Sequence, residues 1–156
     1  MGAPVRGKRR KTSGRFLMLP AAVMQSAAFR SLSHAQVRVL ILLASDYDGQ
    51  NNGSLALTRP QAHAQGIGSN ATLDVGLVVL EQRGLIIRTD PGMLRPPRPA
   101  RFAVTWKDMD KTEFSPRRAA GNDYRNWKGA PSKNKSEAHT VGPDGHTDSA
   151  QGAAWH

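Results

Sequence analysis

The chain has 156 residues, which suffices for one domain with tails and is too short for two ordinary domains. It contains no cysteine, which excludes disulfides, thiolate zinc sites and cysteine nucleophiles. A hydrophobic fraction of 38 % predicts that part of the chain does not pack, and a net charge of +10 predicts a polyanionic partner, usually nucleic acid and less often an anionic membrane surface.

The positive charge is concentrated at the N-terminus. Residues 1–15 carry six Lys and Arg side chains and no acid, in a sequence that offers almost nothing to bury. We therefore predict a basic arm over residues 1–14 that is disordered when free. Lys8, Arg9, Arg10 and Lys11 are suited to following phosphates or entering a minor groove. The alternative is a terminus that only increases solubility.

Hydrophobic periodicity begins after the arm and predicts a folded domain over residues 15–108. Residues 20–27 predict a short Ala-rich helix. Ser33 is a candidate N-cap for a longer helix over His34–Tyr47, whose apolar residues recur at helical spacing and place it at the centre of a core. A turn rich in Gly and Asn follows, and Ser54–Leu57 alternates as a short strand would.

Two further helices follow in close succession. Thr58 can cap a helix over Arg59–Gln65, and Ser69 can cap a second helix over Asn70–Arg83. The Gly-containing turn between them is typical of a helix-turn-helix motif. Leucines at helical spacing bury one face of the second helix, which leaves as outward positions Ser69, Asn70, Thr72, Asp74, Val75, Gly76 and Val79.

Two strands complete the predicted domain. Leu85–Thr89 and Ala100–Trp106 alternate as strands, and the loop Asp90–Pro99 between them holds four prolines. Beyond residue 108 the periodicity fades, so we predict a disordered tail over residues 109–156. Within that tail, the segment Tyr124 to Trp127 interleaves aromatic and basic side chains. It has three possible roles: docking on a partner protein, packing back on the domain, or none.

The predicted fold is therefore mainly α with a small β-wing (α+β), between a basic arm and a tail. Four segments carry a more specific pattern: Phe16–Pro20, Ala28–Ser33, Tyr47–Gly53 and Leu80–Ile86. Through them, residues 14–106 resemble the winged helix-turn-helix domains of phage and plasmid replication initiators and related small bacterial helix-turn-helix proteins. The last segment matches the L-x-x-x-G-hydrophobic exit common after a recognition helix in such domains.

The resemblance implies how the domain would meet duplex DNA. The helix opened by Ser69 would enter the major groove, where Asn70 could read adenine. The alternative is an ordinary core helix with a polar outer face. For any one surface arginine, the alternative is a side chain that contacts only solvent. The candidate DNA-binding residues are Lys8, Arg9, Arg10, Lys11, Arg59, Ser69, Asn70, Thr72, Arg83, Arg95, Arg98 and Arg101.

The remaining polar residues form no pattern that predicts catalysis. The five histidines lack metal-ligand spacing, and no nucleophile–base pair can be argued, so we expect no enzyme activity, metal or cofactor. No apolar run reaches the length of a membrane span, and no secretory signal is evident, so we expect a cytoplasmic protein.

The predicted function is sequence-specific or semi-specific binding of duplex DNA in replication initiation or regulation on a phage, plasmid or related element. Transcriptional regulation with the same fold is the close alternative. A protein–protein adaptor, with the winged helix as its scaffold, is the alternative of another class. A homodimer remains compatible with all three.

Overall fold

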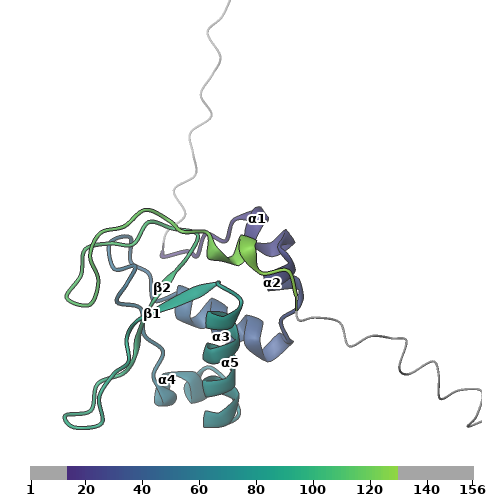
Figure 1. The fold of residues 1–156 in the computed structure, drawn as a ribbon. Coiled ribbons are helices and arrows are strands. Elements are labelled where there is room, and N and C mark those ends of the chain that lie inside the picture. The colour runs from purple at the N-terminus through teal and green to yellow at the C-terminus, as the bar shows by residue number, and fades with distance from the viewer. Residues whose placement is uncertain (1–13, 130–156) are drawn as a thin grey trace, which may run out of the picture.

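The computed structural model describes residues 14–129 as a mixed α+β fold, as predicted, with a two-stranded antiparallel sheet beside five helices (Figure 1). The helices are α1 (Ala21–Gln25), α2 (Ala27–Arg30), α3 (His34–Ala44), α4 (Arg59–Ala64) and α5 (Asn70–Gln82). The strands are β1 (Ile86–Asp90) and β2 (Arg101–Val104), and a 3-10 helix, η1, spans Asp123–Asn126. Residues 1–13 of the predicted arm and 130–156 of the predicted tail lie outside the described residues.

The longest helix, α5, has 13 residues. Accordingly, no helix within residues 14–129 has both the length and the apolar character needed to cross a membrane.

The helix predicted over residues 20–27 is divided in two at Ser26. This residue has extended backbone angles, with φ of −66° and ψ of 150°. Its hydroxyl accepts a hydrogen bond from Phe29 N at 3.2 Å and donates to the carbonyl of Val23. Ser26 therefore ends α1 and caps α2, because its side chain competes for backbone groups that a continuous helix would pair.

α3 begins at the predicted residue because Ser33 and Gln36 form a capping box. Ser33 Oγ accepts from Gln36 N at 3.2 Å, and Gln36 Oε1 accepts from Ser33 N at 3.0 Å. The helix ends at Ala44, three residues before the predicted end. The carbonyls of residues 45–47 instead accept hydrogen bonds from the guanidinium of Arg15, at 3.0 to 3.3 Å.

The core lies where α3 crosses α5. Gly76, predicted to face outward, is buried at this crossing, because a Cβ added there would lie 3.0 Å from Val39 Cγ2. The absence of a side chain lets the two helices approach closely. The valine and leucine side chains that these helices bury are Val39, Leu40, Leu43, Leu73, Leu77 and Leu80.

The sheet pairs Ile86 with Val104 and Arg88 with Phe102, and its register shifts between Arg88 and Asp90. The strand predicted over Ser54–Leu57 is reduced to a single bridge between Leu55 and Phe102, with N···O distances of 3.0 and 2.8 Å. The segment adds one buried leucine to the core and does not lengthen the sheet.

The side chain of Asn52 joins β2 to the chain that follows it. This residue is completely buried, and its Oδ1 accepts from Val104 N at 2.8 Å. Its Nδ2 donates to the carbonyls of Val104, Lys107 and Asp108 at 3.1, 3.3 and 2.9 Å. The Asn52 backbone exchanges further hydrogen bonds with Asp110, at 2.9 and 2.8 Å.

The prediction of a disordered tail from residue 109 is wrong for residues 109–129, which pack on the domain. We call residues 107–129 the strap. Met109 and Arg118 pair through backbone hydrogen bonds of 2.7 and 3.0 Å. η1 packs so closely against Gly84, which has a φ of +70°, that an added Cβ would lie 2.7 Å from the Asp123 carbonyl. The buried residues of the strap, such as Met109 and Tyr124, are far apart in the sequence and follow no helix or strand period. Hydrophobic patterning therefore does not predict that the strap packs.

The aromatic end of the strap packs back on the domain, which was one of the three roles considered for it. Tyr124 is 2 % exposed and belongs to the core cluster, and Trp127 is half-buried against it. η1 lies against α2 (Figure 1).

Asn52→Asp should lower the free energy of unfolding by at least about 3 kcal/mol, because a carboxylate oxygen would face the three carbonyls that now accept from Nδ2. The measurement is urea denaturation followed by circular dichroism. Gln50→Glu, the same chemical change at an exposed site in the same turn, should change stability by no more than about 0.5 kcal/mol. Equal stability of the two variants would contradict the role given to Asn52.

Candidate nucleic-acid interface

The helix pair α4–α5 is built from local caps, as predicted. Thr58 and Gln61 form a capping box at the start of α4, with Pro60 in its first turn. The carbonyl of Gln65 accepts a hydrogen bond from Arg38 on α3, which holds the turn between the helices against the core helix. Figure 1 shows α4 and the N-terminal end of α5 together at the lower side of the molecule.

The two hydroxyls predicted to contact DNA are engaged in the N-cap of α5. Ser69 Oγ accepts from Thr72 N at 3.1 Å and shares a hydrogen bond with Thr72 Oγ1 at 2.9 Å. Ser69 is exposed and Thr72 is half-buried. Any contact of these hydroxyls with a phosphate or a base therefore adds to a capping role that stabilises the helix by about 1 kcal/mol.

Asn70 is held by His63, which the sequence analysis left out of the candidate site. His63 Nδ1 lies 3.0 Å from the carbonyl of Ile67, and its Nε2 lies 2.9 Å from Asn70 Oδ1. The Ile67 carbonyl only accepts, so the proton of a neutral ring resides on Nδ1. Asn70 Oδ1 also only accepts, so the contact at Nε2 is a hydrogen bond when this nitrogen carries a proton too. Ile67 and Asn70 follow His63 by four and seven residues, across the turn between α4 and α5. This spacing is the feature of the sequence that could have predicted the contact.

Arg59, at the start of α4, forms an ion pair with Asp74 on α5. Its guanidinium lies 3.2 Å from the carboxylate, and the two side chains are 60 % and 55 % exposed. An ion pair this exposed contributes about 0–1 kcal/mol, so Arg59 can exchange its partner for a phosphate at little cost. Asp74 lies on the outer face of α5, where its carboxylate would repel a phosphate. The same ion pair offsets its negative charge.

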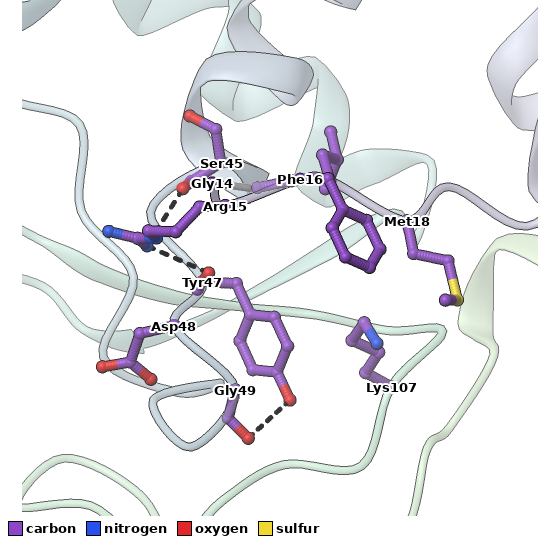
Figure 2. Close-up of a pocket in the computed structure, with 11 residues that line it drawn as sticks. Gly14, Arg15, Phe16, Met18, Ser45, Tyr47, Asp48, Gly49 and Lys107 are labelled. Atoms are coloured by element: carbon purple, nitrogen blue, oxygen red, sulfur yellow. Dashed lines mark hydrogen bonds between the residues drawn. The ribbon is translucent and has the colours of Figure 1, made fainter. Parts of the chain in front are cut away.

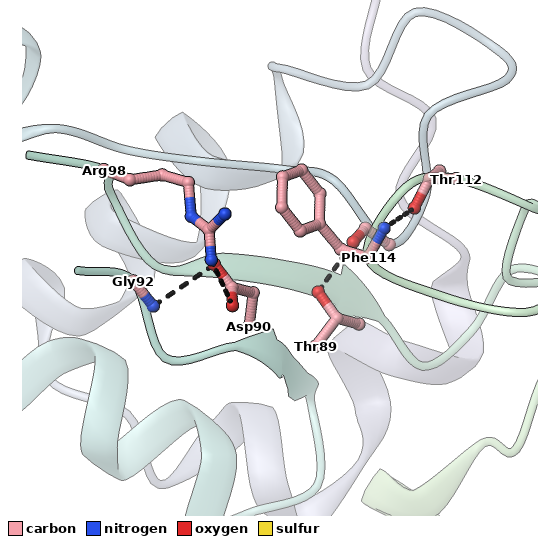
Figure 3. Close-up of polar contacts among 7 residues, drawn as sticks. Thr89, Asp90, Gly92, Arg98, Thr112 and Phe114 are labelled. Carbon is pink, nitrogen blue, oxygen red and sulfur yellow. Dashed lines mark hydrogen bonds and ion pairs between the residues drawn. The ribbon is translucent and has the colours of Figure 1, made fainter. Parts of the chain in front are cut away.

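Only one of the three arginines predicted in or beside the wing is free at the surface. We call residues 91–100, between β1 and β2, the wing. Arg95 is exposed at its tip and makes no hydrogen bond or ion pair within residues 14–129. Arg98 instead forms an ion pair with Asp90 at 3.0 Å and lies over the ring of Phe114, 5.3 Å from its centroid (Figure 3). Arg101 lies over the same ring, at 5.2 Å from the centroid. The strap thus engages the base of the wing.

Arg83 lies away from the other candidates, at the opposite end of α5. Its guanidinium donates to Gln36 Oε1 at 3.4 Å and lies 5.0 Å from the ring centre of Trp127. The solvent-facing middle of α5 carries Val75 and Val78, which are 55 % and 44 % exposed, and no cation. The structure therefore groups Arg59, Ser69, Asn70 and Thr72, and separates Arg83 from them.

A groove of about 750 Å³ connects the helix pair to the wing. Residues 57–60, before and within α4, line one end, and Leu73, Leu77 and Val78 of α5 form one side. The other side is the proline-rich wing with Met93. The groove is mostly apolar, and the charges of Arg59 and Arg98 at its rim are matched by ion pairs.

Gly14 and Arg15, where the predicted arm joins the domain, lie against the C-terminal end of α3. Arg15 binds the carbonyls there, and a pocket of about 330 Å³ opens beside it (Figure 2). Lys107 lies 5.0 Å from the ring centre of Tyr47 in this pocket. Burial raises the pKa of Tyr47, and the negative charges of Asp110, Asp48 and Asp108 raise it further. The point where the basic arm joins the domain is therefore close to three acidic side chains.

Within the part of the chain that the structure describes, no group of three or more His, Asp or Glu side chains is placed to hold a metal ion. Comparison with known proteins found no matching family model, curated protein or solved structure.

Tyr124→Phe leaves Tyr47 as the one tyrosine of the chain, and its titration midpoint, read from ultraviolet absorbance, should lie above 10.0. The folded protein disfavours the tyrosinate relative to the unfolded chain. The neutral phenol of Tyr47 therefore contributes to the stability of the fold below pH 10, and this contribution is lost as the pH rises through the raised pKa. Adding the substitution Asp48→Asn should lower the midpoint. A midpoint at or below 10.0 would contradict this electrostatic picture.

Proposed function

We propose that the chain binds duplex DNA through a surface formed by the N-terminal end of α5, the start of α4 and the tip of the wing. The observation that carries this proposal is the shared groove, which joins the capped helix pair to an arginine-tipped hairpin. A helix of this width fits the major groove, and a hairpin beside it reaches the adjacent minor groove or backbone. In this arrangement the domain is a winged helix-turn-helix.

The charge distribution supports backbone contacts more strongly than base contacts. Residues 14–129 hold 15 Lys and Arg against nine Asp and Glu, and residues 1–13 add five cations and no acid. The outer face of α5, by contrast, has no cation. Affinity therefore depends mainly on phosphates, while sequence preference depends on Asn70, its partner His63 and the shape of the duplex.

The biological role that we propose is replication initiation or regulation on a phage, plasmid or related element, in the cytoplasm. The resemblance of residues 14–106 to replication-initiator domains supports this choice. Transcriptional regulation uses the same surface and the same contacts. The two roles are separated by where the bound site lies, at an origin or at a promoter.

A protein–protein adaptor is the second candidate, and the exposed valines of α5 favour it. Val78 lines the apolar groove and Val75 is exposed three residues before it on α5, so a partner protein could bury both. A titration against a pool of random-sequence duplexes at near-physiological salt, with sequencing of the bound fraction, separates the two functions. An enriched motif supports a sequence reader, binding without enrichment supports a backbone binder, and no binding overturns the DNA proposal in favour of the adaptor.

Replacing Lys8, Arg9, Arg10 and Lys11 by Ala should flatten the salt dependence of DNA affinity. Each lost phosphate contact removes about 0.9 from the slope of log K against log salt, so the slope should fall by up to about 3.6. Fluorescence anisotropy over a series of salt concentrations gives both slopes. The double variant Arg30→Ala, Lys128→Ala removes exposed cations beside α2 and η1 and should keep the original slope. An unchanged slope in the arm variant would remove the arm from the interface.

Substitutions of Ser69 separate its capping role from DNA binding. Ser69→Ala should lower the free energy of unfolding by about 1 kcal/mol, whereas Ser69→Asp should retain stability because Asp is an equally good N-cap. Ser69→Asp should nevertheless weaken DNA binding, because it places a negative charge at the proposed contact. Undiminished binding by the Asp variant would show that the N-terminal end of α5 does not meet DNA.

A further inference from the structure

The most exposed large apolar side chain of residues 14–129 is Leu94, at the tip of the wing. It is 91 % exposed, and its neighbour Met93 is 47 % exposed. Isolated surface leucines are ordinary, but this one projects from a hairpin that extends away from the rest of the domain (Figure 1). The following residue is the exposed Arg95, so a large apolar side chain and a cation stand together at the tip.

The wing is held so that Leu94 stays exposed. Met93 and Arg98 exchange two backbone hydrogen bonds, of 2.9 and 2.8 Å, which close the tip. Pro96, Pro97 and Pro99 restrict the backbone on the return side. At the base, the ion pair between Arg98 and Asp90 is covered by Phe114 of the strap (Figure 3). The tip is thus presented in advance and little conformational entropy is lost when it binds.

We propose that Leu94 is a wedge that enters the minor groove and inserts between two base pairs, with Arg95 holding the flanking phosphates or the groove floor. Minor-groove proteins combine these two features: an apolar side chain such as Leu partially unstacks a base step, and an adjacent cation binds the groove. The duplex then kinks toward its major groove, by roughly 20–90°. This inference rests on the proposed DNA-binding function and assigns to the wing the deformation of the duplex.

The position of the wing agrees with the direction of such a kink. The groove between α5 and the wing separates the major-groove element from the tip. A kink toward the major groove wraps the duplex around the N-terminal end of α5 and brings more phosphates within reach of Arg59. Flexible pyrimidine–purine steps, which unstack at least cost, are the steps that the wedge would favour.

The test uses the full chain and a duplex of about 30 base pairs, carrying a fluorescent donor at one end and an acceptor at the other, with a central TA step. Energy transfer reports the bend, and anisotropy reports affinity in the same samples. Leu94→Ala should abolish the increase in transfer seen with the unaltered protein while keeping the salt slope. Arg95→Ala should reduce the slope by about 0.9. Leu94 is almost fully exposed, so its loss leaves the fold intact.

Two variants serve as controls. Leu94→Met retains a long apolar side chain and should retain the bend. Met24→Ala removes an apolar side chain exposed on α1, outside the proposed DNA-binding surface, and should also bend the duplex as the unaltered protein does.

The outcomes distinguish the wedge from the proposed function. Binding without a bend, or an equal bend with Leu94→Ala, overturns the wedge and leaves DNA binding standing. The absence of any binding overturns both. If the DNA stays straight and sedimentation shows self-association that Leu94→Ala abolishes, the tip docks on a second copy of the chain and the wedge is again wrong.

Discussion

The buried amide of Asn52 is the interaction on which the arrangement of the wing depends. This one side chain closes the turn after α3 against β2 and against the first residues of the strap, through Val104, Lys107 and Asp108. An amide can do so because it carries both donors and an acceptor, whereas a carboxylate has only acceptors. Since β2 directly follows the wing, the contacts of Asn52 fix where the hairpin leaves the core. The position of the wing tip relative to α5 thus depends on hydrogen bonds of a buried side chain.

Where the sequence predicted the structure well, the deciding interactions are local. Ser33, Thr58 and Ser69 each bond a backbone N–H three residues ahead, and the helices that they cap begin at the predicted residues. Helix ends and the strap depend on partners far along the chain: Arg15 takes up the carbonyls after α3 from about 30 residues away. No local pattern encodes such contacts. Patterning therefore assigned residues 109–129 to a tail, although they pack on the domain.

The candidate site shows the same division. Ser69, Asn70 and Thr72 lie together because a cap fixes them, as their spacing predicted. Arg98 and Arg101 were expected to extend the basic surface of the wing, yet their guanidinium groups stack on Phe114, a residue of the strap that periodicity had assigned to a disordered tail. The interface that we propose therefore combines a helix face without cations and a single exposed arginine at the wing tip. Its chemistry suits a protein that reads the shape and flexibility of a duplex more than its base edges.

The packing of the strap also sets the order in which the domain can be completed during synthesis. Phe114, which covers Arg98 and Arg101, and Tyr124, which fills the core beside α2, are made after every helix and strand of the sheet. A nascent chain that has just emerged through β2 therefore has its wing but lacks the groups that cover the wing base and fill the core. The contacts of the packed domain extend from Arg15 to Trp127, so the chain can close on itself only after Trp127 has left the ribosome.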